Sequence, residues 1–334
     1  MTVNILALES SCDETSAAVI QDGNVLSNTI LSQSVHEIYG GVVPELASRA
    51  HQQHIISVVV KALKDANITL DALDAIAFTR GPGLLGSLLV GISFAKGLSL
   101  SKNLPLIDVN HMQAHILAHF IEEPRPKFTF LCLTISGGHT QLVLVKDYLD
   151  MKVIGETRDD AVGEAFDKIA KMLGLPYPGG HLIDKYAAMG DPLKFKFPVT
   201  VVPNYDYSFS GIKTAVLYFL RDELRKDSSF IKRNINDLCA SIQHTLIEML
   251  FEKLVISAHT QGITEVALAG GVAANSQIRS RIMELSVQNN WKAYIPRLEY
   301  CTDNAAMIGI AGYYKYLHGD ICDLSVTPDA RLKF

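Results

Sequence analysis

The sequence predicts an α/β protein built by duplication, with two related lobes and a cleft between them. One observation is the mixture of short apolar strand patterns and helical patterns along the whole chain. The other is a unit of strand, small polar loop, strand and strand that occurs twice, about half a chain apart. Because strand–turn–strand patterns are common, a chance recurrence is the alternative explanation.

The first copy of this unit begins with an apolar strand at residues 4–8 and a polar loop at residues 9–15. Strands at residues 17–20 and 25–29 then flank the turn Gln21-Asp22-Gly23-Asn24. An Asp-Gly pair between two apolar runs is a strong signal for a hairpin. The two flanking strands are therefore expected to pair in antiparallel fashion.

The second copy has an apolar strand at residues 128–135, a loop at residues 136–140 and a return strand at residues 141–145. Residues 151–154 fit a third strand of this copy. Pro44 suits the first turn of a helix. The remaining patterns predict helices at residues 44–63, 161–173 and 237–259, and short strands at residues 76–78, 106–109 and 266–269.

Length and composition indicate a large globular protein. The chain has 334 residues, which suggests about two domains. Its 48% hydrophobic and 19% charged residues are typical of a protein with a sizeable core. The net charge of −5 argues against binding nucleic acid through overall charge, so any RNA binding would depend on local patches or on partner subunits.

The N-terminus and the cysteines favour a cytoplasmic protein. No basic segment precedes the short apolar run before Glu9, which argues against a signal peptide. The longest uncharged stretch, at residues 81–95, is too short to span a bilayer. The five cysteines are scattered and form no C-x-x-C motif, which favours reduced thiols over a disulfide framework or a cysteine zinc cluster.

Three loops have the composition expected of a nucleotide-binding site. Ser136-Gly137-Gly138-His139-Thr140 offers backbone N–H groups with little steric hindrance to phosphate oxygens. Ser10-Ser11-Cys12-Asp13 offers hydroxyls and a carboxylate. A double glycine at residues 270–271 follows a buried strand, and Asn275 is placed to cap the helix that begins after it. Each loop by itself is also consistent with an ordinary turn.

Two carboxylates near a fourth loop are candidates for ribose binding. This loop, at residues 177–184, contains Pro-Gly-Gly and ends at Asp184, and Asp167 lies upstream of it. Either carboxylate can accept hydrogen bonds from ribose hydroxyls. Either is also consistent with a solvated acid on the surface.

Histidines at a spacing of four residues predict a metal site. His111, His115 and His119 would lie on one face of a helix, where two imidazoles can share a metal ion. Asp303 is a candidate third ligand, or alternatively the N-cap of the last helix. Such a set, with open coordination positions, suits Fe²⁺, Zn²⁺ or Mn²⁺. Met112 replaces the catalytic glutamate of an H-E-x-x-H metalloprotease, so peptide hydrolysis is not expected.

Eight short motifs occur in order between about residue 4 and about residue 316. They are ESSCDET at residues 9–15, GGVVPE at 40–45, GPGL at 81–84, HMQAH at 111–115, SGGHT at 136–140, GEAFDK at 163–168, SGIKTA at 210–215 and GGVAAN at 270–275. In this order and spacing they resemble the tRNA N6-adenosine threonylcarbamoyltransferase family. The chain departs from the family pattern at Gln113-Ala114, where Glu-Gly is common, and at His181, where proline is usual.

The resemblance implies a fold and a reaction. The fold is the duplicated actin/Hsp70-like ATPase fold with a central cleft for nucleotide and metal. We expect one lobe at residues 1–108 plus about 305–334, and the other at residues 109–304. The reaction transfers threonylcarbamoyl from threonylcarbamoyl-AMP to the exocyclic N6 amine of the adenosine 3′ of the anticodon (position 37), in tRNAs that read codons starting with A. A small-molecule kinase of the same fold is the alternative.

The resemblance also implies the residues of the site. His111, His115 and Asp303 would bind one divalent metal ion, with Fe²⁺ preferred over Zn²⁺ and Mn²⁺. Independently of the resemblance, the carboxylate of Asp13 in the loop at residues 9–15 makes it a candidate catalytic residue that would assist proton removal or contact a metal–phosphate unit. An adenine nucleotide, threonylcarbamoyl-AMP or ATP, would be bound by Thr134, Ile135, Ser136, Gly137, Gly138, Asp167, Gly180, Asp184 and Asn275.

The resemblance implies that the partners are tRNA, a pseudo-enzyme of the same fold and a small P-loop ATPase. Binding to a membrane is not expected. Basic residues at 221–226 and 232–233 are candidates for RNA contact. Because acids are mixed among them, they are also consistent with a solvated helix face. The apolar residues 87–95 are consistent either with helix packing against a partner or with the core.

Overall fold

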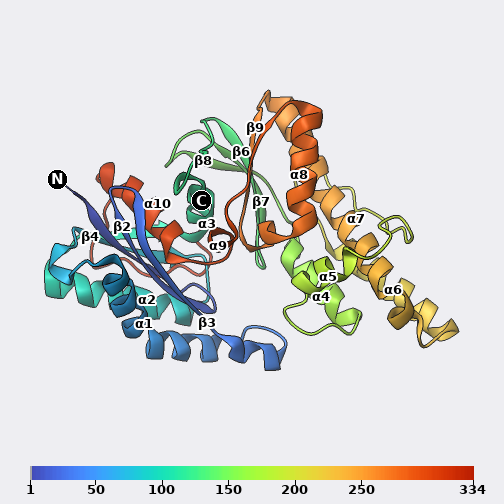
Figure 1. Ribbon diagram of the computed structural model, residues 1–334, viewed down its shortest axis with the longest axis horizontal. Helices are drawn as coiled ribbons and strands as arrows, with labels where there is room; N and C mark the ends of the chain where they lie inside the picture. The colour runs from blue at the N-terminus through green and yellow to red at the C-terminus, as the bar shows by residue number, and fades with distance from the viewer. Residues whose placement is uncertain (1) are drawn as a thin grey trace. The chain divides into compact units, whose positions relative to one another are not determined.

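The computed structural model describes residues 2–334, and Figure 1 shows them as a ribbon. The contacts divide the chain into two units. The first contains the residues up to Pro126 together with Lys146–Met151 and Pro296–Phe334, and the second contains Lys127–Val145 and Lys152–Ile295. The lobe limits expected from the sequence, residue 108 and about residue 305, both lie inside the first unit. The division of the chain into two lobes at these limits stays a prediction.

The first unit contains one mixed sheet and the helices that cover it. Its strands are β1 (Asn4–Glu9), β2 (Glu14–Gln21), β3 (Asn24–Ser32), β4 (Ala75–Gly81) and β5 (Leu106–Asn110). Its helices are α1 (Pro44–Ala66), α2 (Leu85–Lys102), α3 (His111–Leu117), α9 (Leu298–Cys301) and α10 (Ala305–Leu317), with 3-10 turns η1 (Ser34–Tyr39), η2 (Leu70–Ala72) and η3 (Ala118–Phe120).

The second unit repeats this plan with a larger helical part. Its strands are β6 (Phe130–Ile135), β7 (Thr140–Val145), β8 (Met151–Glu156), β9 (Glu265–Ala269) and β10 (Lys292–Tyr294). Its helices are α4 (Val162–Met172), α5 (Gly180–Ala187), α6 (Ser210–Lys226), α7 (Phe230–Gln261) and α8 (Ser276–Asn289), with the 3-10 turn η4 (Gly271–Ala274).

The two sheets have the same topology. In the described residues the first sheet has the order β3-β2-β1-β4-β5, and the second has the order β8-β7-β6-β9-β10. In the first sheet β1 pairs antiparallel with β2 and parallel with β4. In the second sheet β6 pairs antiparallel with β7 and parallel with β9. The repeat read from the sequence is therefore a structural duplication and not a chance recurrence.

Several local predictions are confirmed. The first hairpin turns at Asp22 and Gly23, whose φ angles of 49° and 80° suit the primed turn that Asp-Gly favours. Helix α1 begins at Pro44, as predicted.

The predicted start of helix α7, near residue 237, is wrong, since the helix begins at Phe230. The first turns of α7 are rich in polar residues and carry little apolar periodicity, so the sequence pattern did not reveal them.

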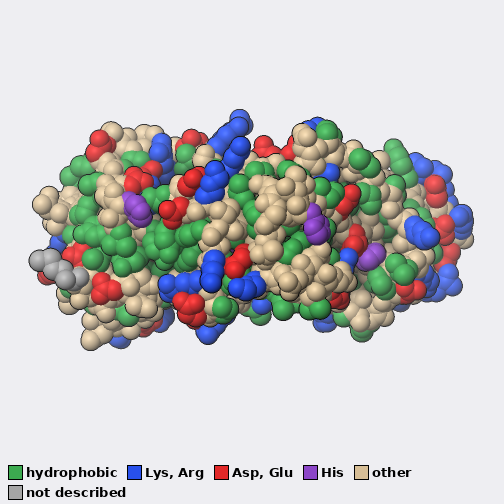
Figure 2. Space-filling view, turned by 90° about the horizontal axis from the view of Figure 1, so that it is seen from above, with side chains coloured by type: hydrophobic (Ala, Val, Ile, Leu, Met, Phe, Trp, Pro, Cys, Tyr) green, Lys and Arg blue, Asp and Glu red, His purple; other side chains and the backbone are tan. Residues whose placement is uncertain are grey.

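The surface carries charges of both signs. Figure 2 shows basic and acidic side chains interspersed over the face in view. The basic residues expected either to contact RNA or to be solvated are largely paired with neighbouring acids: Arg221 and Arg225 with Asp222, Lys226 with Glu223, and Arg233 with Asp227. None of the helices in residues 2–334 is both long enough and apolar enough to cross a membrane.

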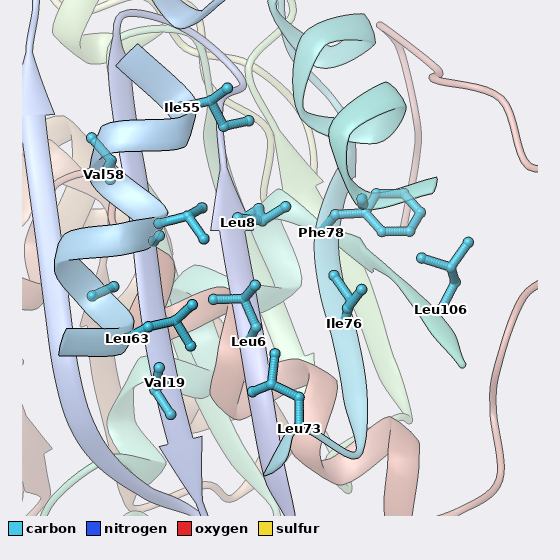
Figure 3. Packing of buried hydrophobic residues seen from close by; sticks show 14 of the residues in the cluster. Leu6, Leu8, Val19, Ile55, Val58, Leu63, Leu73, Ile76, Phe78 and Leu106 are labelled. Atoms are coloured by element: carbon cyan, nitrogen blue, oxygen red, sulfur yellow. The ribbon is translucent and has the colours of Figure 1, made fainter. Parts of the chain in front are cut away.

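A hydrophobic core lies between one face of the first sheet and helices α1 and α2 (Figure 3). Leu6 and Leu8 of β1 and Phe78 of β4 point into it, together with Ile55 of α1 and Ile92 of α2. Burying each such side chain stabilises the fold by about 1.5–3 kcal/mol. This packing fixes β1, β4 and β5 side by side, and the carboxyl ends of these strands carry the candidate metal site.

The opposite face of the same sheet is covered by α10. A Cβ added to Gly309 would lie 3.1 Å from the Cβ of Ala7, and one added to Gly312 would lie 2.5 Å from the Cβ of Ala77. Alternate residues of a strand face the same side. Glu9, two residues after Ala7, therefore lies on the α10 side at the carboxyl end of β1.

Candidate metal centre and nucleotide loops

The two candidate histidine ligands lie on α3, directly after β5. Asn110 caps this helix, and its Oδ1 accepts hydrogen bonds from the backbone N of Met112 at 2.9 Å and of Gln113 at 3.2 Å. The cap fixes where the first turn begins, and residues four positions apart lie on one helix face. His111 and His115 therefore present their rings to the same side, with centroids 4.7 Å apart.

Asp303 completes the cluster from the segment before α10. Its Oδ1 lies 3.3 Å from Nε2 of His111 and 3.1 Å from Nε2 of His115. One ligand atom from each of the three residues lies within 4.8 Å of the others. The N-cap of α10 is Asn304, whose side chain accepts from the backbone N of Met307 at 3.0 Å. Asp303 is thus not the cap, which removes the alternative left open by the sequence.

The expectation that three histidines share one helix face is wrong for His119. Helix α3 ends at Leu117, and His119 lies in the 3-10 turn η3. The change from α-helix to 3-10 turn breaks the four-residue register. Within residues 2–334, the cluster of potential ligands around Asp303 contains His111 and His115 but not His119.

Glu9 contacts His111 of this cluster and was not predicted as a site residue from the sequence. Its Oε2 lies 2.9 Å from Nδ1 of His111 and accepts a hydrogen bond from Oγ1 of Thr79 at 2.7 Å. A signal was present, since side chains at the carboxyl ends of neighbouring parallel strands meet at one edge of a sheet. Using it required knowing that β1, β4 and β5 are neighbours.

The charged groups of the cluster shift one another's pKa. Burial opposes the charged form of His111, but the carboxylates of Asp303 and Glu9 raise the pKa of His111 well above its ordinary value. Burial also opposes ionisation of both carboxyl groups, yet the charge of His111 lowers the pKa of Asp303 and of Glu9 below the ordinary range. Burial lowers the pKa of His115, which favours its neutral form.

These residues fit a divalent cation. Two imidazole nitrogens and one carboxylate oxygen converge, and three protein ligands leave coordination positions for water or substrate. Nδ1 of His115 is buried without a hydrogen-bond partner within residues 2–334. The atom of His115 that faces Asp303 is Nε2, so a cation shared with Asp303 would bind Nε2 and leave Nδ1 unpaired. A bound cation would take the place of a proton on His111.

The loop that carries Asp13 is held by α1 and α2. The backbone O of Cys12 accepts hydrogen bonds from Nε2 of His51 at 2.9 Å and from Oγ of Ser87 at 3.3 Å. Burial and the charges of Asp303 and Asp13 raise the pKa of the neighbouring Glu14 to about 9. The loop is therefore held at the backbone of Cys12 and lies in a strongly acidic part of the first unit.

The second unit presents the glycine loop between β6 and β7. Thr134 and Ile135 end β6 with buried side chains, and the backbone N of Ser136 donates to the O of His139 at 2.8 Å. A Cβ added to either Gly137 or Gly138 would meet no atom within 4 Å. The loop thus leaves open space beside its backbone, as expected where an anion approaches N–H groups.

Asp167 and Gly180 are brought together. Oδ1 of Asp167 accepts hydrogen bonds from the backbone N of Gly179 at 2.8 Å and of Gly180 at 3.0 Å. Burial raises the pKa of Asp167, and these two N–H groups oppose the rise. Asp167 is therefore a structural anchor for the start of α5 and not simply a solvated acid.

Asp184 and Asn275 meet at the start of α8. The side chain of Asn275 accepts from the backbone N of Gln277 and of Ile278, both at 3.0 Å, which confirms the predicted cap. Its Nδ2 donates to the buried Gln243 at 2.8 Å. Asp184 accepts a hydrogen bond from the backbone N of Ser276, the first residue of α8, at 2.9 Å. The second unit thus joins α5, α7 and α8 at residues expected to bind nucleotide.

Comparison with known proteins identifies relatives along the full length of the chain. The family model of tRNA N6-adenosine threonylcarbamoyltransferase (TsaD) matches residues 24–310. The chain is 62% identical over 335 residues to the tRNA N6-adenosine threonylcarbamoyltransferase of Christiangramia forsetii, and the match covers 99% of this chain and 98% of that protein.

Solved structures with low sequence identity share the fold. Component A of the (R)-2-hydroxyglutaryl-CoA dehydratase of Acidaminococcus fermentans matches with a TM-score of 0.53 at 14% identity, over 95% of this chain and 99% of that chain. Full-length HypF matches with a TM-score of 0.62 at 13% identity, over 94% of this chain and 46% of that chain. Neighbours of this kind have the actin/Hsp70-like ATPase fold, which confirms the predicted fold class.

Proposed function

Because this chain belongs to the tRNA N6-adenosine threonylcarbamoyltransferase family, we propose that it transfers threonylcarbamoyl from threonylcarbamoyl-AMP to N6 of adenosine 37 of tRNA. The acceptors are tRNAs that read codons starting with A, and the product is N6-threonylcarbamoyladenosine (t6A). The observation that carries this function is 62% identity over the whole chain to a protein of that name. The small-molecule kinase has no comparable support.

The metal centre is proposed to consist of His111, His115 and Asp303. Two histidines and one carboxylate with open positions are the ligand set that favours Fe²⁺ in proteins, so Fe²⁺ is the proposed ion. When bound, such an ion supplies Lewis-acid polarisation to an oxygen of the donor. The residues of the chain hold this position rigid, since both imidazoles are buried and α3 is capped at its first turn.

The nucleotide part of the donor is assigned to the second unit. The backbone N–H groups of Gly137 and Gly138 would donate to phosphate or carbamoyl oxygens in the open space beside the loop. Thr134, Ile135 and Ser136, which lead into these glycines, are proposed to bind the nucleotide with them. Asp184 keeps free lone pairs beside its bonds to Ser276 and would accept from ribose hydroxyls. The remaining nucleotide-binding residues of this proposal are Asp167, Gly180 and Asn275.

The reaction needs orientation more than activation, because the donor is a mixed carbamoyl–phosphate anhydride with a good leaving group. The N6 amine attacks the carbamoyl carbon and a C–N bond forms. The bond between the carbamoyl carbon and the phosphate oxygen breaks, AMP leaves with that oxygen, and the amine loses a proton. Holding amine and carbonyl in contact is the main contribution expected of the protein. Asp13 is proposed to assist proton removal or to contact the metal–phosphate unit.

The proposed partners are tRNA, a pseudo-enzyme of the same fold and a small P-loop ATPase, and the proposed location is the cytoplasm. The net charge of −5 and the paired basic side chains of α6 favour shared binding of tRNA with such partners. Nucleic-acid affinity depends on positive charges that are not paired with neighbouring acids, and the basic side chains of α6 are largely paired.

The test is transfer of labelled threonylcarbamoyl from threonylcarbamoyl-AMP into purified tRNA, with the partner proteins present and Fe²⁺ supplied without oxygen. The wild type is expected to label the tRNA, and the double variant His111→Ala/His115→Ala is expected to lose the activity while still binding the adenylate. Absence of labelling by a folded, metal-loaded wild type would overturn the proposed function. Labelling by the double variant at the wild-type rate would overturn only the metal centre.

A further inference from the structure

Glu9 lies where three neighbouring parts of the first unit meet. It is the last residue of β1 and is 1% exposed. Thr79 of β4 and His111, which follows β5, contact the same carboxylate. These strands are adjacent in the order β1-β4-β5, so the position of Glu9 is set by the sheet and not by a flexible loop.

Both carboxylate oxygens of Glu9 have a donor. Oε1 accepts a hydrogen bond from the backbone N of Ser11. Oε2 accepts from Oγ1 of Thr79 at 2.7 Å and lies 2.9 Å from Nδ1 of His111. A buried carboxylate that is fixed by two other donors cannot turn away from the histidine, so the ring nitrogen always faces an acceptor.

This contact determines which ring nitrogen of His111 carries the proton. An ionised carboxylate only accepts hydrogen bonds, so Nδ1 must be the donor. Oγ of Ser11 lies farther from the same nitrogen, at 3.3 Å, and its hydroxyl is free to orient either way. A neutral His111 with its proton on Nδ1 has its lone pair on Nε2, the atom that faces Asp303.

We propose that Glu9 is the positioning residue of the metal centre, which holds the proton on Nδ1 of His111 so that Nε2 is presented to the cation. This inference rests on the proposed metal centre of His111, His115 and Asp303. A carboxylate that accepts from the outer nitrogen of a ligand histidine fixes the ring orientation and increases the basicity of the ligand. Glu9 itself does not touch the cation in this proposal.

The variant Glu9→Gln tests the proposal because the amide has one oxygen where the carboxylate has two. If the amide nitrogen takes the place of Oε2, it faces Nδ1–H of His111, donor against donor. If it takes the place of Oε1, it faces the N–H of Ser11 in the same way. The first arrangement breaks the contact that fixes the ring, and the second loses the bond from Ser11 that holds the side chain in place. Affinity for metal is therefore expected to fall by about 10–100-fold.

The probe is Co²⁺, titrated into metal-free full-length protein and followed by its visible ligand-field absorption. Glu265→Gln is the matched control, because Glu265 also accepts from a backbone N, that of Lys127 at 2.7 Å, and from a hydroxyl, that of Tyr294 at 2.8 Å, but contacts neither candidate ligand. Glu265→Gln is expected to bind Co²⁺ like the wild type. His111→Ala is expected to lose binding altogether.

A second measurement avoids the variants, since Glu9→Gln can fail to fold. Nitrogen-15 NMR of histidine-labelled wild type loaded with Zn²⁺ reports which nitrogen of His111 bears the proton. A protonated Nδ1 supports the proposal, and a protonated Nε2 overturns it.

The outcomes separate the two claims. Wild-type affinity in a folded Glu9→Gln variant, combined with loss of binding in His111→Ala, would overturn the role of Glu9 and leave the metal centre intact. A wild type that binds no Co²⁺, or one whose binding survives His111→Ala, would overturn the metal centre and the role of Glu9 together.

Discussion

Asp184 accepts two hydrogen bonds from Ser276, one from the backbone N at 2.9 Å and one from Oγ at 2.8 Å. These bonds join α5 to the first turn of α8. The carboxylate is thus held in place before any ribose binds, and preorganised groups bind ligands at a lower entropic cost.

Asp184→Ala is therefore expected to affect both stability and donor binding. Loss of two hydrogen bonds to a charged group should lower the free energy of unfolding by about 1–3 kcal/mol, and affinity for the adenylate should fall by roughly tenfold. Urea unfolding and equilibrium binding measure the two effects. Ser276→Ala, which removes only the hydroxyl donor, should show a smaller loss of both, and equal adenylate affinity in wild type and Asp184→Ala would exclude Asp184 from the site.

Gly137→Ala separates binding from folding at the glycine loop. A Cβ at this position meets no atom within 4 Å, so the variant should unfold at the wild-type urea concentration. The methyl group would occupy space assigned to the donor, so adenylate affinity should fall by more than tenfold, measured by calorimetry. Unchanged affinity in this variant and in Gly138→Ala would show that the phosphate does not lie against this loop.

Gly270→Ala should instead damage the fold. Gly270 has a φ of +87°, and an added Cβ would lie 2.4 Å from the O of Ile135. Strain of this kind is expected to cost at least about 2 kcal/mol of unfolding free energy. Gly271→Ala is the control, because a Cβ there meets nothing within 4 Å. Equal stability of the two variants would show that the backbone before η4 does not require glycine at position 270.

Asp108 should make the stability of the first unit depend on pH. Its Oδ1 accepts from Lys315 at 3.0 Å and its Oδ2 from Arg80 at 3.1 Å. Burial opposes ionisation, but Lys315 and Arg80 lower the pKa of Asp108 below its ordinary value. The resulting stabilisation is complete above the unfolded pKa of about 3.9 and is lost as the pH falls through the lower folded pKa.

Asp108→Asn is expected to unfold about 1–3 kcal/mol more easily than the wild type near neutral pH. The difference should shrink as the pH falls below about 3.9, because the carboxyl is then protonated first in the unfolded chain and, below the lower folded pKa, in the folded protein as well. Urea titrations over a pH series measure it. Asp71→Asn should change little at any pH, since Asp71 pairs with Lys102 with 81% of its side chain exposed. A difference independent of pH would rule out the charge of Asp108 as its cause.

Metal removal should lower the thermal stability of the first unit. A ligand present at about one hundred times its Kd stabilises the folded protein by about 2.7 kcal/mol. Wild-type protein treated with chelator should melt at a lower temperature and recover when Fe²⁺ is added without oxygen. Asp303→Ala should melt at one temperature with or without metal. A wild type that shows the same insensitivity would contradict the metal centre.

Local sequence signals predicted those features that depend on local structure. Asp22-Gly23 predicted the hairpin, Pro44 the start of α1 and Asn275 the cap of α8, because each acts on backbone within a few residues. The duplication was visible because the same apolar pattern specifies both sheets. The spacing of His111 and His115 predicted one shared face, since α3 continues through both.

Features set by tertiary packing were not visible in this way. Glu9 reads as the first residue of a polar loop, and its contact with His111 crosses 102 positions of the chain. The register of His119 was mispredicted because nothing in the local pattern marks the change to a 3-10 turn after Leu117. Whether Asp303 is a ligand or the cap of the last helix could not be decided from the sequence, because it depends on which way its side chain faces in the folded protein.

The most direct test of the account is the identity of the nucleoside made in tRNA. Purified tRNA that reads codons starting with A would be incubated with the wild-type protein, Fe²⁺, threonylcarbamoyl-AMP and the partner proteins, then digested and analysed by mass spectrometry. We expect t6A at position 37, and none when His111 and His115 are replaced by alanine. Unmodified adenosine at that position, with folded wild type and active partners, would contradict it.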